Sequence, residues 1–190
     1  RRLAAPIFEQ VLFKRVPLFR PQPFLIAALP WVRPLLSRGF LLVVAMAMLT
    51  GLVLVGRQTA TFVAGFSAIY SIEGVVAIVL ALTIAKAVHE LAHAFVTVHY
   101  GGDVPSMGVM FILFWPMLYT ETSSAWAMRE RRKRIAIAAA GMIAELALAA
   151  FALLAWGVVE PGAIRSALQF TATSLIGLTI LVNANPLMRF

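Results

Sequence analysis

Two histidines and a glutamate are the residues of this sequence best placed to do chemistry. His89, Glu90 and His93 form an HExxH pattern. On a helix, residues four apart share one face and lie about 6 Å apart along the axis, so both imidazoles can reach one ion. Neutral imidazole is a good zinc ligand, and a glutamate beside the first ligand can take a proton from water. The pattern predicts Zn²⁺ held by His89 and His93, with Glu90 as the catalytic base of peptide-bond hydrolysis.

The motif lies in a long apolar segment, residues 72–100, which also contains Lys86. Ionisable side chains inside a membrane helix are costly unless they pair with one another or bind something. An alternative is that the cluster hydrogen-bonds neighbouring helices or forms the ion path of a membrane transporter. We favour the metal site because an ion path does not require this spacing.

The sequence leaves the third zinc ligand open. A catalytic zinc usually has three protein ligands, and without cysteine these must be nitrogen or oxygen atoms. Glu145 lies in a later apolar segment at a depth comparable to that of His89, so we expect it to hydrogen-bond a ligand imidazole. Pairing with Lys86, direct ligation of zinc and a protonated packing role are the alternatives. Three other carboxylates are more simply solvated or salt-bridged: Asp103, Glu121 and Glu130.

The composition indicates the environment in which this site must work. Of 190 residues, 62% are hydrophobic and 13% are charged, whereas about a quarter of a soluble domain is charged. With a mean hydropathy of +0.92, the chain is predicted to be an integral membrane protein. The net charge of +8 is then a topological signal, since basic residues mark cytoplasmic loops, and we expect no nucleic-acid partner.

The apolar segments predict an all-α polytopic membrane protein with about four transmembrane helices. Their expected ranges are 39–56, 72–100, 135–159 and 166–182. The apolar stretch 104–118, between the second and third helices, is short and contains Pro105, Gly108 and Pro116. We expect it to form a re-entrant segment or a β-hairpin packed against protein.

The basic residues divide the chain and orient it. Residues 1–38 contain seven basic residues and six prolines, which predicts an irregular or interfacial cytoplasmic segment before a membrane-embedded core at 39–190. Five more basic residues lie in 129–134. By the positive-inside rule, the N-terminus and this loop are cytoplasmic. The HExxH motif and the end of the fourth helix are therefore expected near the same face.

Polar residues follow the fourth apolar segment. Asn183 and Asn185 precede Pro186, which lacks a backbone donor and frees a carbonyl in the preceding turn. Broken, polar helix at membrane depth is tolerated where it lines a cavity. We expect the two asparagines to bind substrate or support the zinc ligands; a plain helix end at the interface is the alternative.

Together the HExxH motif, the Gly-Gly pair that follows it and the Asn-x-x-Pro at 183–186 resemble the site-2 protease family of intramembrane zinc metalloproteases. The second signature of that family is Asn-x-x-Pro-x-x-x-Leu-Asp-Gly, whose aspartate is the third zinc ligand. Asn183, Pro186 and Phe190 match in register, with Phe in place of Leu. The resemblance implies that the third ligand follows Phe190 and that the core is incomplete at its C-terminus. A different enzyme interpretation uses Glu145 as that ligand.

The stretch 116–126 also resembles a bacterial branch of the family, the peptide zinc metalloproteases, through Tyr119, Ser123 and Trp126. Glu121 is usually aspartate in that branch, which leaves its role open. The resemblance implies a zinc-dependent endopeptidase of the bacterial plasma (inner) membrane, cleaving a membrane-inserted polypeptide. A hairpin near 103–118 could present that substrate as an added strand. The sequence does not specify the oligomeric state.

Overall fold

A computed structural model of the chain describes residues 13–112 and 115–179. These residues belong to two compact units. The sheet unit comprises described residues of Arg1–Arg33 and Glu90–Ala139, and the helical unit those of Pro34–His89 and Ala140–Phe190. Helices α5 (Ile72–His99) and α6 (Arg131–Val158) run unbroken through the division. Each unit therefore contains part of both long helices.

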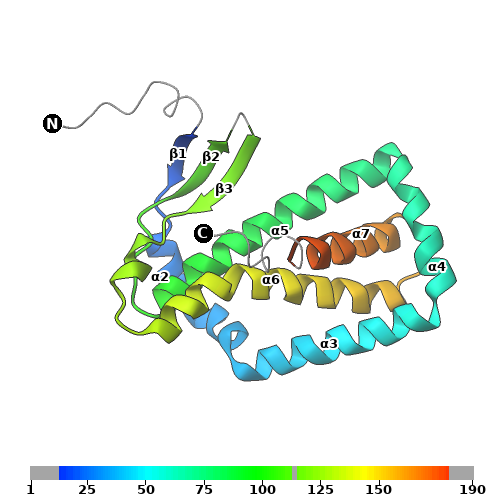
Figure 1. The fold of residues 1–190 in the computed structure, drawn as a ribbon, viewed down its shortest axis with the longest axis horizontal. Coiled ribbons are helices and arrows are strands. Elements are labelled where there is room, and N and C mark those ends of the chain that lie inside the picture. Colours follow the sequence, from blue (N-terminus) through cyan, green and yellow to red (C-terminus); the bar gives the residue numbers. More distant parts are fainter. Residues whose placement is uncertain (1–12, 113–114, 180–190) are drawn as a thin grey trace. The chain divides into compact units, whose positions relative to one another are not determined.

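The sheet unit contains a three-stranded antiparallel sheet (Figure 1). Its strands are β1 (Phe13–Phe19), β2 (Met107–Ile112) and β3 (Trp115–Thr120), in the order β1-β2-β3. The pairing of β2 with β3 confirms the hairpin predicted between the second and third long helices. Because β3 is an edge strand of the described sheet, one row of its backbone groups is not used within that sheet.

The prolines and basic residues predicted an irregular or interfacial segment, and the irregular part of this prediction is wrong for residues 13–36. This part contains β1, helix α2 (Gln22–Val32) and a short 3₁₀ helix, Arg33–Leu36. Two of the prolines occupy places where proline is tolerated: Pro23 lies in the first turn of α2, and Pro17 lies in an edge strand beside a register irregularity. Pro30, in contrast, lies inside α2. Composition alone did not reveal these positions.

Helix α2 and the C-terminal part of α5 share the core of the sheet unit. Its buried members come from both helices and from the chain around β2: Leu25, Ala94, Phe95, Val104 and Met107. Helix α5 ends just before Gly101, whose φ of 80° is left-handed and suits glycine at a helix terminus. This packing fixes the last two turns of α5 relative to the sheet.

The helical unit contains α3 (Arg38–Arg57), α4 (Thr59–Ala64), the 3₁₀ segment Gly65–Tyr70 and α7 (Ala163–Leu178), together with parts of α5 and α6. Ser37 caps α3 by accepting a hydrogen bond from the Phe40 N–H at 3.1 Å. Small side chains allow close helix packing in the two apolar clusters of this unit. Their buried members are Ala85, Ala149 and Leu175, and Ala152, Leu153 and Ala172.

Three described helices are long and apolar enough to cross a membrane: Arg38–Arg57, Ile72–His99 and Arg131–Val158. They agree with the first three predicted spans. Apolar side chains of α3 such as Leu42 and Leu49 are exposed, which suits a surface solvated by lipid. Helix α7 has 16 residues, and the remainder of the predicted fourth span lies outside the described residues. The chain is therefore a mostly helical integral membrane protein with a small sheet.

Candidate metal centre

The HExxH motif lies on α5, as the sequence predicted. His89, Glu90 and His93 all fall within the continuous helix Ile72–His99. Along one α-helix, the two histidines are therefore about one turn apart, with Glu90 beside the first. This spacing belongs to the helix itself.

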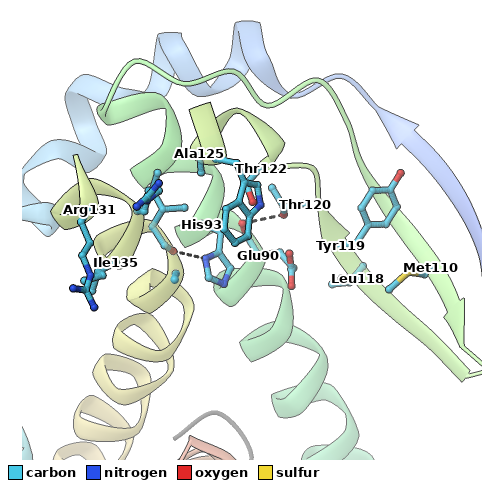
Figure 2. Close-up of a pocket in the computed structure, with 14 residues that line it drawn as sticks. Glu90, His93, Met110, Leu118, Tyr119, Thr120, Thr122, Ala125, Arg131 and Ile135 are labelled. Atoms are coloured by element: carbon cyan, nitrogen blue, oxygen red, sulfur yellow. Dashed lines mark hydrogen bonds between the residues drawn. The ribbon is translucent and has the colours of Figure 1, made fainter. Parts of the chain in front are cut away.

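In the sheet unit, a backbone carbonyl orients His93. Its Nδ1 lies 2.7 Å from the carbonyl oxygen of Ile137 on α6 (Figure 2). A carbonyl oxygen only accepts hydrogen bonds, so Nδ1 donates this one, and in the neutral ring Nε2 then carries the lone pair. This is the tautomer in which a metal binds through Nε2.

Glu90 and His93 line one pocket of about 700 Å³ within the sheet unit. Figure 2 shows Glu90, His93 and the labelled residues of β3 around this pocket. The Thr120 hydroxyl donates to the backbone carbonyl of Glu90 at 3.1 Å, which connects the end of β3 to the turn of α5 that contains the motif. The remaining wall is mainly apolar and aromatic with two arginines: Met110, Leu118, Tyr119, Trp126, Arg131 and Arg134.

In the helical unit, Glu145 of α6 contacts His89. Its Oε1 lies 3.0 Å from His89 Nδ1 and 2.6 Å from Lys86 Nζ, and its Oε2 accepts from the Thr179 hydroxyl at 3.1 Å. The Glu145 side chain is 0% exposed. Glu145 thus makes both of the first two contacts weighed from the sequence. Its carboxylate already has three polar neighbours without a metal.

The other acidic residues considered from the sequence have polar partners outside the motif. Asp103 accepts a hydrogen bond from Gln22, Glu121 lies beside Arg15 and Ser123, and Glu130 pairs with Lys133. Within residues 13–112 and 115–179, no group of three or more His, Cys, Asp or Glu side chains forms a metal-binding cluster. Asn183 and Asn185 lie outside the described residues.

The two histidines of the motif on α5 are side chains of a type that binds zinc. Zinc prefers imidazole nitrogens, and metal-bound histidines usually donate their other N–H to a carboxylate or a carbonyl. His89 meets a carboxylate through Nδ1 and His93 meets a carbonyl through Nδ1. Each ring, within its own unit, therefore has the Nδ1 contact that is typical of a histidine that binds a metal through Nε2.

Several residues of this environment were not found from the sequence. Thr179 and Thr120 carry no motif, and the partner of His93 is a backbone atom of Ile137, which side-chain patterns cannot indicate. Arg131 and Arg134 were attributed to a topogenic basic run. The helical register offered one signal, because they are three residues apart and share a helix face.

Comparison with known proteins gives one match. Residues 77–188 match the family described as Peptidase family M50. The matched region is more than half of the chain and includes the HExxH motif, the hairpin and α6. A search of curated proteins and a search of solved structures each found no match.

Proposed function

The chain belongs to peptidase family M50, the site-2 protease family, and on this premise we propose that it is a zinc-dependent intramembrane endopeptidase. The observation that carries the proposal is the HExxH motif on one unbroken helix, with the Nδ1 atom of each histidine already engaged. The spacing places two imidazoles on one face of a membrane-length helix. Neither the family match nor the contacts of the described residues favour the ion-path alternative.

His89 and His93 would hold the zinc ion through Nε2, as two of its protein ligands. When bound, zinc supplies a Lewis acid that polarises the scissile carbonyl and makes water a better nucleophile. Glu90 takes the proton from the attacking water and returns it to the leaving amine. Asn183 and Asn185 support the ligands or bind the substrate in this proposal.

The pocket beside Glu90 and His93 is the proposed entry for the polypeptide substrate. Its apolar and aromatic wall suits a membrane-inserted chain, and β3 is an edge strand that can accept an extended segment by backbone hydrogen bonds. Arg131 and Arg134 add positive charge to this wall. The substrate would therefore bind as an extended segment beside the catalytic turn.

We also propose that the chain lies in the bacterial plasma membrane, and the positions of the basic residues support an orientation with the N-terminus in the cytoplasm. A fourth span would include α7. In this arrangement water and substrate reach Glu90 from the cytoplasmic side.

A single substitution tests the proposed reaction. Glu90→Gln removes the base but changes neither histidine, so cleavage by the purified protein should fall by about 10²–10⁴-fold while its zinc content stays that of the wild type. Glu73→Gln, an exposed glutamate in the first turn of the same helix, is the matched control. Cleavage by the Glu90→Gln variant at the wild-type rate would rule out Glu90 as the base. Ion flux in vesicles without any peptide cleavage would favour the transporter alternative.

A further inference from the structure

One face of α6 fits closely around the His89 imidazole in the helical unit. A Cβ atom built on Gly141 would lie 2.4 Å from Nε2 and 2.5 Å from both Cδ2 and Cε1 of His89. These are its three nearest atoms, and all belong to this one ring. A real Cβ cannot occupy that position unless the imidazole moves.

The three nearly equal distances also show where Gly141 lies on the ring. An atom in line with the Nε2 lone pair would be clearly farther from the two flanking carbons than from the nitrogen. Gly141 therefore packs against the face of the imidazole. It does not occupy the direction in which Nε2 would bind a metal.

Glu145 holds the same ring from its edge. It is one helical turn after Gly141 on α6, so both residues lie on one helix face. Its Oε1 is 3.0 Å from His89 Nδ1. Lys86 Nζ, at 2.6 Å from Oε1, and the Thr179 hydroxyl, at 3.1 Å from Oε2, fix the carboxylate in turn. The ring is thus restrained both in its plane and across its face.

We propose that Gly141 and Glu145 are positioning residues for His89, acting as a cradle in α6 that sets the orientation of this zinc ligand. The inference rests on the proposed zinc function. Gly141 contributes the space for the ring, and Glu145 contributes the acceptor that keeps the proton on Nδ1 and directs Nε2 to the ion. A larger residue at 141 turns the ring away, and loss of the carboxylate at 145 releases its edge.

The test compares Gly141→Ala with Gly56→Ala in the intact, purified protein. Gly56 lies on α3 and has nothing within 4 Å of a built Cβ, so it controls for adding a methyl group to a membrane helix. Gly141→Ala should weaken Zn²⁺ binding by about 10- to 100-fold and change the absorption spectrum of the Co²⁺-substituted protein. Gly56→Ala should leave both measurements as in the wild type. Glu145→Gln should weaken Zn²⁺ binding over the same range.

A double-mutant cycle in the metal-free protein tests the contact itself. Gly141→Ala should lower the thermal unfolding midpoint when residue 89 is histidine and should not lower it in the His89→Ala background, because the clashing ring is gone. If Gly141→Ala alone fails to fold, His89→Ala should restore folding. A purely structural glycine would cost the same stability in both backgrounds, and that result overturns the inference.

The two proposals fail in different ways. A wild-type protein that binds no Zn²⁺ contradicts the proposed function. A wild-type protein that binds Zn²⁺ while Gly141→Ala binds it equally tightly contradicts the cradle alone.

Discussion

The two histidines of the motif have different partners for Nδ1. His89 meets a buried carboxylate, whereas His93 meets the carbonyl oxygen of Ile137. A carboxylate carries a formal charge and makes the stronger, charge-assisted hydrogen bond. The orientation of His89 therefore depends on side chains that mutation can change, while that of His93 depends on the backbone of α6.

Replacing His93 should remove zinc from the protein. His93→Ala deletes one of the proposed ligands, so Zn²⁺ affinity should fall by more than the ~100-fold that follows loss of a supporting partner. Metal content after purification and competition with a chelator measure this. His99→Ala is the control, because His99 lies on the same helix and stacks against Tyr100. Equal zinc binding by His93→Ala and the wild type would remove His93 from the site.

Residue types and their spacing could predict the HExxH motif, but not every residue that contacts its side chains. The matched depths of His89 and Glu145 followed from counting residues along two apolar segments. Gly141 could not be found in that way, because its contribution is the absence of a side chain facing one particular ring. The partner of His93 is a backbone carbonyl oxygen, which every residue type has, so the sequence does not indicate it.

The hairpin is the element that brings the sheet to the motif. Thr120, the last residue of β3, donates to the carbonyl of Glu90, and β3 is an edge strand of the described sheet. An edge strand can pair with an added extended chain. In the proposed function, a substrate strand added to this edge would lie next to the proposed base, Glu90.

Proline substitutions in β3 should interfere with substrate binding. Adjacent residues of a strand point their N–H groups to opposite sides, so Met117→Pro and Leu118→Pro together remove one donor on each side. Cleavage should fall in both variants, and the one whose N–H faces away from β2 should keep wild-type thermal stability. Met117→Ala and Leu118→Ala control for the lost side chains. Full cleavage by both proline variants would exclude strand addition at this edge.

Helices and strands could be predicted from the sequence where a single signal, such as hydropathy, was strong. Long apolar segments predicted α3, α5 and α6 with small errors at their ends, because hydropathy and length agree there. The strand β1 was missed because its prolines and basic residues resemble those of a loop, and its partner β2 lies more than 80 residues away in the sequence. Pairing between distant segments has no local signature.

The chain combines helices long enough to span a membrane with basic residues that are concentrated in particular loops. Arg57 and Arg165 are alone in their loops, whereas five basic residues occupy 129–134. This asymmetry predicts that the loop before α6 is cytoplasmic and that the loop after α3 is on the opposite side.

Single-cysteine labelling tests this topology, because the chain contains no native cysteine. Ala127→Cys and Ser67→Cys introduce thiols at exposed positions before α6 and after α3. In intact cells, a membrane-impermeant thiol reagent should label Ser67→Cys and should reach Ala127→Cys only after the membrane is opened. The reverse pattern would invert the proposed orientation.

The proposed function requires a metal ion at the HExxH motif. The most direct measurement is peptide cleavage by the intact protein in vesicles, before and after removal of metal by a chelator, with the zinc content determined in each sample. We predict that the purified protein contains zinc, that chelation abolishes cleavage, and that added Zn²⁺ restores it in the wild type but not in Glu90→Gln. A metal-free protein that cleaves its substrate regardless of chelator would contradict the central claim.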